Sequence, residues 1–218
     1  MLGFFLIAKI SFSDEKTQIK QYETGGIYDG EFLNGHQHGK GKYSLPNGYN
    51  YEGDWKEGKI EGLGIAKYPD GSSYEGNFVD GQHSGQGKLI FPDGTFYEGN
   101  WLKGKFNGKG ILKYSNGISL EGNFFDGLLN GKGMQFNSNG YKYNGDWKLG
   151  KKSGIAVINY EGGGIYQGEV LNGARQGAGK LTLLDGSVLE GLFNNGTISG
   201  KGSIIYSNGD NYIGELLK

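Results

Sequence analysis

Residues 51–73 read YEGDWKEGKIEGLGIAKYPDGSS, and residues 97–119 read YEGNWLKGKFNGKGILKYSNGIS. The two stretches share the opening Tyr-Glu-Gly, a tryptophan two residues later and further glycines at matching places. The same frame of 23 residues starts at residues 28, 51, 74, 97, 120, 143, 166, 189 and 212, without insertion or deletion. A fixed period of this length is typical of repeat proteins. We number each repeat from its first residue, so that Tyr51 and Tyr97 occupy repeat position 1.

Glycine makes up 45 of the 218 residues, and 41 of the 45 fall on this frame. Positions 3, 8, 12 and 21 are always glycine, and position 14 departs from glycine only at Ala156. Each interior glycine costs a helix about 1 kcal/mol relative to alanine, so this composition excludes a helical protein. Only 3 prolines exclude collagen, and 15 Tyr, 12 Phe and 3 Trp argue against disorder. The composition therefore indicates a β protein.

Turn residues divide each repeat into two strands. Positions 20 and 21 are usually Asn-Gly or Asp-Gly, as in Asn47-Gly48. These dipeptides favour a type I′ hairpin turn, in which both central residues have positive φ. The prolines occupy position 19, where a missing N–H costs less than in a ladder: Pro46, Pro69 and Pro92. We predict a type I′ turn at positions 20–21 and a tight, glycine-rich connection over positions 8–14.

The strand that follows this turn alternates between large rings and polar residues. Tyr51 and Trp55 occupy positions 1 and 5, whereas Glu52 and Asp54 occupy positions 2 and 4. Because the side chains of a strand alternate between faces, rings line one face and carboxylates the other. Gly53 lies between the two rings, where a side chain would collide with its surroundings. No repeat can bury its ring face alone, so the repeats must stack.

We therefore predict an all-β fold: an elongated, twisted, single-layer β-hairpin solenoid of 23-residue repeats. The repeat array is expected over residues 19–218, with residues 19–27 forming half a repeat. Residues 1–18 are expected to be a leader or cap. Their apolar run from Leu2 to Ala8 is far shorter than the roughly 20 residues that span a bilayer, and an edge strand or loose cap is the favoured interpretation.

The pattern Tyr-x-Gly-x-Trp/Phe-x-x-Gly-x-x-x-Gly-x-Gly resembles the MORN repeat (membrane occupation and recognition nexus), over residues 28–218. The resemblance implies a β-hairpin solenoid with an aromatic groove, in a non-catalytic adaptor or scaffold of cytoskeletal, ciliary or membrane-contact structures. The chain departs from the pattern at Leu120, Leu189, Ala156 and Val170, so the groove is expected to be less aromatic in its C-terminal half.

The ring column is the first candidate binding site. Stacked rings are structural material, but exposed aromatic stripes also mark binding surfaces. A purely structural role and a combined structural and partner-contacting role both remain open. The predicted partner is an extended or helical segment of another protein. The residues expected to contact it are Tyr28, Tyr51, Trp55, Tyr74, Phe78, Tyr97, Trp101, Tyr143 and Trp147.

The alternative function is peripheral binding to anionic phospholipids such as phosphoinositides, through lysines at positions 13 and 15. Each lysine near such a surface is attracted by about 1 kcal/mol. The candidate lysines are Lys40, Lys42, Lys88, Lys109 and Lys132. The net charge of −1 gives no electrostatic reason to expect nucleic-acid binding. It also means that acidic residues offset the charge of a lysine stripe unless their side chains lie on the opposite face.

No motif indicates catalysis. Residues 53–59, 99–105 and 145–151 imitate a phosphate-binding loop, yet they lack its Ser/Thr and fall across a predicted strand. His36 and His38 occur in the repeat that starts at residue 28, and His83 occurs in the one that starts at residue 74. For all three, solvated loop histidines are favoured over a metal site. The regularly spaced acids of position 2 indicate a solvated face with cross-strand pairs. We predict a non-enzyme without cofactor or metal, with carbohydrate-active chemistry as a minor alternative.

The chain contains no cysteine, which fits a reducing compartment. We expect a cytoplasmic protein associated with the cytoskeleton or a membrane. The strand near Tyr212 would leave an open edge, and open edges pair with other chains unless they are protected. A homodimer through this C-terminal edge is therefore expected.

Overall fold

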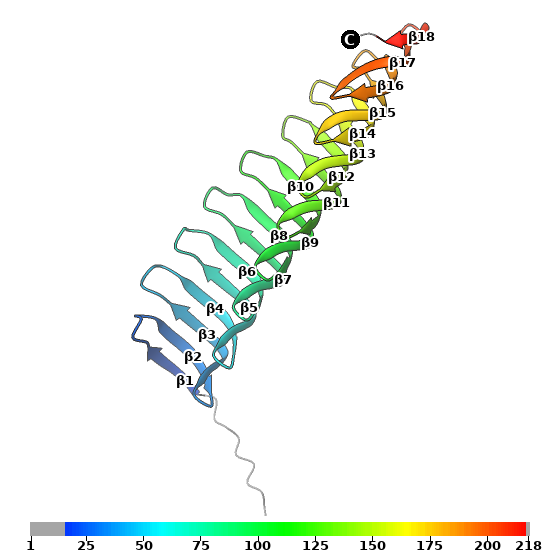
Figure 1. The fold of residues 1–218 in the computed structure, drawn as a ribbon. Helices are drawn as coiled ribbons and strands as arrows, with labels where there is room; N and C mark the ends of the chain where they lie inside the picture. Colours follow the sequence, from blue (N-terminus) through cyan, green and yellow to red (C-terminus); the bar gives the residue numbers. More distant parts are fainter. Residues whose placement is uncertain (1–15, 217–218) are drawn as a thin grey trace, which may run out of the picture. The chain divides into compact units, whose positions relative to one another are not determined.

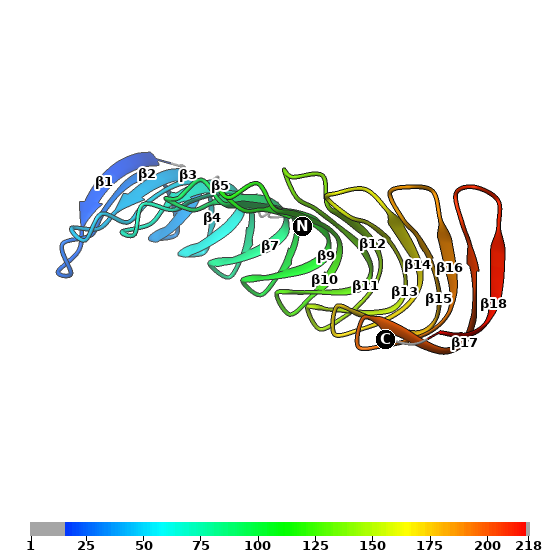
Figure 2. The ribbon, with the colours of Figure 1, turned by 90° about the horizontal axis from the view of Figure 1, so that it is seen from above.

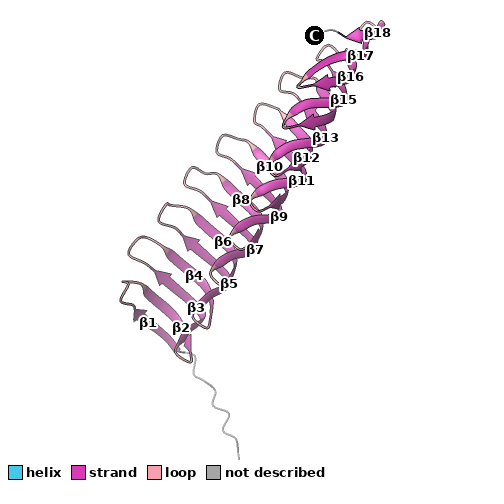
Figure 3. Cartoon of the chain, in the orientation of Figure 1, coloured by secondary structure: helices cyan, strands magenta, loops and turns pink. Residues whose placement is uncertain are grey.

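The computed structural model describes residues 16–216, which form eighteen β-strands joined by turns (Figures 1 and 3). The described part of the chain divides into two compact units, with the boundary between Gln82 and His83. No helix long and apolar enough to cross a bilayer occurs within residues 16–216. The apolar run from Leu2 to Ala8 lies outside the described residues.

The first unit is a β-meander in which each strand pairs antiparallel with the next. Its strands are β1 (Lys16–Gln21), β2 (Ile27–Leu33), β3 (His36–Ser44), β4 (Asn50–Lys56), β5 (Lys59–Lys67) and β6 (Ser73–Val79). Strand β1 begins three residues before the predicted start of the array at residue 19, so the predicted boundary falls inside a strand.

The second unit continues the same meander pattern, and its strands curve along their length (Figure 2). It comprises β7 (Gln82–Ile90), β8 (Phe96–Leu102), β9 (Lys105–Lys113), β10 (Ser119–Phe125), β11 (Leu128–Phe136), β12 (Lys142–Lys148), β13 (Lys151–Asn159), β14 (Ile165–Leu171), β15 (Ala174–Thr182), β16 (Val188–Asn194), β17 (Thr197–Ile205) and β18 (Asn211–Leu216). The predicted all-β hairpin repeat is thus confirmed, with two strands in each 23-residue repeat.

The type I′ turn lies at positions 7–8 and not at positions 20–21. Asn34 and Gly35 both have positive φ, 52° and 80°, and the flanking Leu33 and His36 are register partners. Two consecutive left-handed residues define a two-residue type I′ loop. The same pair of positive φ values recurs in all eight complete repeats. The predicted glycine-rich connection over positions 8–14 is wrong, because the strand resumes at position 9.

The Asn-Gly and Asp-Gly dipeptides of positions 20–21 form a different turn. At Pro46-Asn47-Gly48 only the glycine has positive φ, 97°. Gly48 N–H donates to the Leu45 carbonyl, and Leu45 N–H donates to the Tyr49 carbonyl. This is a type I turn followed by a bulge glycine, which also explains proline at the first central position. Asn47 Oδ1 accepts from Tyr49 N–H at 3.0 Å, so the side chain is selected as a local acceptor and not for positive φ.

A recurring β-bulge explains the tyrosine that usually occupies position 1 and the glycine columns of positions 3 and 14. Gly30 and Gly41 lie opposite each other, and the register shifts directly after Gly30. The Tyr28 ring lies over this pair, so a Cβ on Gly41 would come within 2.3 Å of the Tyr28 hydroxyl. That hydroxyl donates to the Glu31 carbonyl at 2.9 Å, a backbone group at the shifted position. The ring therefore closes the bulge and leaves little room for a side chain on the glycines beneath it.

The strands present two chemically different faces. The ring face carries positions 1 and 5 together with their cross-strand partners at positions 16 and 10, as in the pairs Tyr28–Tyr43 and Phe32–Gln37. The charged face carries positions 2, 4, 13 and 15. Each unit has a single sheet, so its core is the ring layer itself: Tyr28, Tyr51, Tyr74, Tyr97, Tyr143 and Tyr166 are at most 1% exposed.

Candidate binding face

The nine residues predicted to contact a partner form the buried floor of the ring face. The position 1 tyrosines are enclosed, and burial raises the pKa of both Tyr28 and Tyr97 to about 12. Their hydroxyls are occupied by carbonyls at position 4: Tyr51 donates to Asp54, Tyr74 to Asn77, Tyr97 to Asn100 and Tyr143 to Asp146, at 2.7–3.0 Å. These rings build the fold, and a direct partner contact stays a prediction for them.

The position 5 rings pack edge-on against the tyrosines. Tyr51 meets Trp55 with ring centroids 5.5 Å apart and planes at 83°, and it meets Phe78 at 5.2 Å and 88°. Trp101 Nε1 donates to the Gly87 carbonyl at 3.0 Å. Such T-shaped contacts stabilise aromatic clusters beyond the area that they bury. Trp55, Trp101 and Trp147 expose at most 7% of their surface, so little of each ring is left for a partner.

A second, partly exposed layer lies on this floor, and the site prediction missed it. It consists of positions 10, 16 and 18. In the sequence, positions 16 and 18 are mostly apolar, as in Leu89 and Phe91. The apolar members that are half-buried or exposed include Tyr43, Tyr68, Leu89, Phe91, Phe106, Tyr114, Tyr160, Leu181, Leu183 and Tyr206.

Residues of position 10 also compensate for missing tyrosines. Leu120 replaces the position 1 ring, and Leu129 from position 10 covers the glycines instead: a Cβ on Gly133 would lie 2.1 Å from its Cδ2. In the repeat that begins with Leu189, Ile198 approaches Gly191 in the same way. The predicted loss of aromatic character is therefore offset by aliphatic packing from the neighbouring strand.

In the first unit, a hollow of about 380 Å³ opens at the end of the ring layer. Tyr22, Gln37 and Tyr43 line it together with Glu23 and Thr24. Gln37 Nε2 donates to the Tyr22 hydroxyl at 2.7 Å, and the rings of Tyr22 and Tyr43 meet edge-on at 6.3 Å. This end of the ring face combines aromatic surface with the hydrogen-bonding groups of Thr24 and Gln37 and the carboxylate of Glu23.

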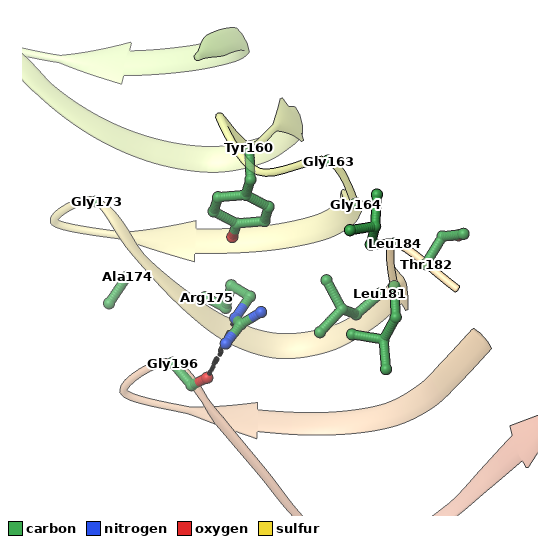
Figure 4. A pocket seen from close by; sticks show the side chains of 11 residues that line it. Tyr160, Gly163, Gly164, Gly173, Ala174, Arg175, Leu181, Thr182, Leu184 and Gly196 are labelled. Atoms are coloured by element: carbon green, nitrogen blue, oxygen red, sulfur yellow. Dashed lines mark hydrogen bonds between the residues drawn. The ribbon is translucent and has the colours of Figure 1, made fainter. Parts of the chain in front are cut away.

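In the second unit, a hollow of about 490 Å³ lies among β14, β15 and the neighbouring turns (Figure 4). Tyr160 and Arg175 lie on one side of it, and Leu181 and Leu184 lie on the other. Glycine makes room for this hollow, because position 22 is Gly164 here, whereas other repeats carry residues such as Tyr49, Ser72, Thr95 or Tyr141. The result is an apolar depression with one guanidinium in its wall.

Two cations occupy position 10 in successive repeats of the second unit. Lys152 lies over three rings, with Nζ 4.6 Å from the centroid of Tyr141, 5.0 Å from Tyr143 and 5.8 Å from Trp147. Burial lowers the pKa of Lys152 to about 8. The Arg175 guanidinium lies 5.2–5.9 Å from three other rings, those of Tyr160, Tyr166 and Phe193.

The predicted lipid-binding lysines lie on the charged face, and most are paired with acids there. Lys40 pairs with Asp54 at 2.5 Å, Lys42 with Glu52 at 3.2 Å, Lys88 with Glu98 at 3.0 Å and Lys132 with Asp146 at 2.7 Å. Lys109 is exposed on the same face. The predicted cross-strand pairing of the position 2 acids is thus confirmed at Glu52 and Glu98. The acids point the same way as the lysines, so they offset the stripe locally.

The remaining motifs have structural explanations. Residues 53–59, 99–105 and 145–151, which imitate a phosphate-binding loop, each run from one strand through a type I′ turn into the next strand. His83 packs edge-on against Trp101 at 4.8 Å, and burial lowers its pKa to about 4. Within residues 16–216 no group of three His, Cys, Asp or Glu residues is placed to hold a metal ion.

Comparison with known proteins extends these observations. The family model described as MORN repeat matches residues 28–48, 51–73, 74–96, 97–119, 121–140, 143–165, 166–188 and 190–211. These matches cover most of the chain and follow the 23-residue frame. No curated protein sequence matches the chain.

Among solved structures, the TCP10 domain of CPAP from Danio rerio is similar in fold, with 13% identity, a TM-score of 0.50, and coverage of 92% of this chain and 98% of that domain. The same domain in complex with a peptide of Danio rerio STIL gives a TM-score of 0.49 at 13% identity, covering 93% and 98% of the two chains. The TCP domain of Drosophila melanogaster SAS-4, in complex with a proline-rich motif of Ana2, gives 0.41 at 14% identity, covering 98% and 96%. At this level of identity the likeness concerns the fold alone.

Proposed function

The chain belongs to the MORN repeat family, and from that premise we propose that it is a non-catalytic interaction scaffold that binds a segment of a partner protein on its ring face. The family and the hairpin repeat support the general assignment to a scaffold. The choice of face rests on the contrast between the two sides of the sheet.

The observation that carries the proposal is the partial exposure of the side chains in the second layer. Positions 10, 16 and 18 leave apolar and aromatic side chains half-buried in columns, beside hollows of about 380 and 490 Å³. Exposed aromatic surface of this kind is typical of binding faces, where Tyr and Trp supply contact area at low entropic cost. On the charged face the ion pairs already satisfy many of the charges within the protein.

Site-directed photo-crosslinking tests the face. A photoreactive phenylalanine analogue is placed at Tyr114, which is 38% exposed at position 18, and in a separate variant at Ile111, which is 40% exposed at position 15 on the charged face. The two sites have matched exposure and lie three residues apart. We expect a protein adduct in extracts of the native cell from the Tyr114 site and none from the Ile111 site. Equal adducts from both sites, or adducts from Ile111 alone, would contradict the proposal.

The phospholipid alternative ranks lower because of the ion pairs. Anionic headgroups would have to displace Asp54, Glu98 and Asp146 from their lysines. Flotation of the protein with phosphoinositide vesicles at low salt decides this point, and co-flotation that is lost in a Lys88/Lys132 double variant would revive the alternative.

Two further predictions concern assembly and location. At the edge strand β18, Tyr212 is 42% exposed and Ile213 is 82% exposed, which keeps the C-terminal homodimer as a proposal that light scattering tests. Association with a cytoskeletal, ciliary or membrane structure in the cytoplasm is likewise a proposal, which imaging of the tagged protein with markers of these structures tests.

A further inference from the structure

Lys152 differs from the paired lysines of the charged face, Lys40, Lys42, Lys88 and Lys132, in having no carboxylate partner among residues 16–216. Its ammonium lies over Tyr141, Tyr143 and Trp147, and its Nζ donates to the Tyr141 hydroxyl at 2.9 Å. An ammonium has three donors, so two remain available to a ligand. The lowered pKa of about 8 still leaves most of the group protonated at neutral pH.

Arg175 is the equivalent residue of the next repeat. Its Nε and Nη2 atoms donate to the Gly196 carbonyl at 3.1 and 2.5 Å, which holds the guanidinium in place (Figure 4). A guanidinium has five N–H donors, so this carbonyl leaves one edge available. The side chain also lines the hollow of about 490 Å³, which shows that the group is accessible from the ring face.

The charge pattern of this region is complementary to an acidic ligand. Lys132 and Lys180, from the same part of the chain, are neutralised on the charged face by Asp146 and Glu190. Lys152 and Arg175 form no ion pair within the described residues, and both are half-buried over rings. Half-buried cations of this kind gain from a partner that brings its own carboxylates.

The spacing of the two cations constrains the ligand. Lys152 is the second residue of β13 and Arg175 is the second residue of β15, and β14 lies between these strands. The backbones of the two residues are therefore two strand spacings apart, about 9.6 Å. A polyproline II segment advances about 3.1 Å per residue with three residues per turn, so its residues i and i+3 lie on one side about 9.3 Å apart. A segment that crosses the strands in this conformation keeps register with the repeats.

We propose that Lys152 and Arg175 bind two carboxylates, three residues apart, of a partner segment in the polyproline II conformation that crosses β13, β14 and β15 on the ring face. This inference rests on the proposed function, since it names the partner chemistry of the same face. The adjacent hollow, walled by Tyr160, Leu181 and Leu184, accommodates an apolar side chain of the same segment. Aromatic-lined surfaces are the usual hosts of such segments, because the extended helix costs little entropy to order.

Fluorescence anisotropy with synthetic probes tests the inference. The probe is a labelled peptide of repeating Glu-Pro-Pro. Its controls are repeating Gln-Pro-Pro, which lacks the charge, and repeating Glu-Pro-Pro-Pro, which has the wrong spacing. The protein variants are K152M and R175M, with K148M as the matched control, because Lys148 is an exposed lysine on β12. Circular dichroism melting shows whether each variant is folded.

We expect the Glu-Pro-Pro probe to bind best and each cation variant to weaken its binding about tenfold, since a hydrogen bond to a charged group contributes on that order. The preference for Glu-Pro-Pro over Gln-Pro-Pro should shrink in K152M and in R175M and should be unchanged in K148M. This ratio compares two probes on one protein, so a small change in folding does not affect it.

Three results would overturn the inference. The first is no binding of the Glu-Pro-Pro probe to the folded protein, and the second is a Glu/Gln preference that survives both variants. The third is binding to phosphatidylserine vesicles that depends on Lys152 and Arg175 while the peptide does not bind, which would assign the pair to a membrane surface. If the crosslinks at Tyr114 persist in any of these cases, the proposed scaffold function stands and only the acidic ligand is wrong.

Discussion

The two faces of the strands obey different physical rules, although they are made by alternate residues of the same repeats. On the ring face, Tyr97 lies directly over Gly110, and a Cβ on that glycine would come within 2.3 Å of the tyrosine hydroxyl. On the charged face, Lys88 and Glu98 meet at 3.0 Å with about half of each side chain exposed. Stability therefore depends on close packing on one face, whereas the other face tolerates change. Lys152 is a charged residue on the ring face, where close packing of rings is the norm, and it is therefore a candidate for function.

The largest expected effect comes from filling the space under a ring. Gly110→Val should destabilise the second unit by about 3 kcal/mol, because the added methyl groups collide with Tyr97 and with the bulge. Valine is preferred to alanine for this test because Ala156 occupies the equivalent position in another repeat. Thermal melting measures the change. The control is Lys109→Val, one residue away on the charged face, where a change within about 0.5 kcal/mol is expected. Similar losses for both variants would refute the distinction between the faces.

The next effect concerns the tyrosine hydroxyl. Tyr97→Phe leaves the Asn100 carbonyl at the bulge without its 2.9 Å hydrogen bond, and we expect a loss of about 1.5 kcal/mol. Tyr114→Phe is the control, since this ring is 38% exposed and no bulge depends on it. Urea denaturation of both variants gives the comparison. An unchanged Tyr97→Phe protein would show that the ring alone, without its hydroxyl, holds the bulge.

A smaller and pH-dependent effect is expected at Lys152. Burial lowers its pKa to about 8 in the folded protein, below the usual value of 10.5, so the unfolded chain binds more protons between these two pH values. The stability of the wild type should therefore rise with pH from about 8 to about 10.5, relative to K152M. Below pH 8 the variant should be the more stable protein by about 1 kcal/mol. Melting temperatures from pH 7 to 10.5 check this, and parallel curves would mean that the ammonium is not desolvated.

The smallest effect is expected on the charged face. Lys132 and Asp146 meet at 2.7 Å, and the hydrogen bond from Lys132 lowers the pKa of the Asp146 carboxyl. An exposed pair of this kind contributes about 0.3 kcal/mol, so Lys132→Met should hardly change the melting temperature at neutral pH. The contribution is present above the ordinary carboxyl pKa of about 3.9 and is lost as pH falls through the folded value. A loss above about 1 kcal/mol at pH 7 would show that the pair is structural.

The repeat frame predicts much of the fold because its signals are local. Gly35, Gly48 and Tyr28 occupy turn or bulge positions that are decided within one hairpin. The type I′ turn predicted at positions 20–21 is wrong because Asn-Gly dipeptides also occur at positions 7–8, such as Asn34-Gly35, and the type I′ turn lies there. Both dipeptides satisfy the same sequence rule. Only the observed φ values separate a type I′ turn from a type I turn with a bulge.

The candidate site was harder to predict, because exposure depends on neighbouring repeats. Tyr51 and Trp55 are the largest apolar residues of their repeat, and the sequence favours them as contacts, but the next strand buries them to 1% and 7% exposure. Tyr68 and Tyr160 are also large aromatic residues, yet they are only half-buried. Lys152 and Arg175 look like ordinary solvated cations until the register places them over rings.

The sequence by itself determined the 23-residue frame, the two strands of each repeat, the alternation of rings and charges, and the family. These properties follow from local backbone preferences and from the period-two geometry of a strand. The tertiary structure decided which rings stay reachable, which lysines are neutralised by acids, and where two cations share one column without a carboxylate partner among the described residues. Those outcomes depend on contacts between neighbouring strands and repeats, and the distances across strands exist only after the repeats have stacked.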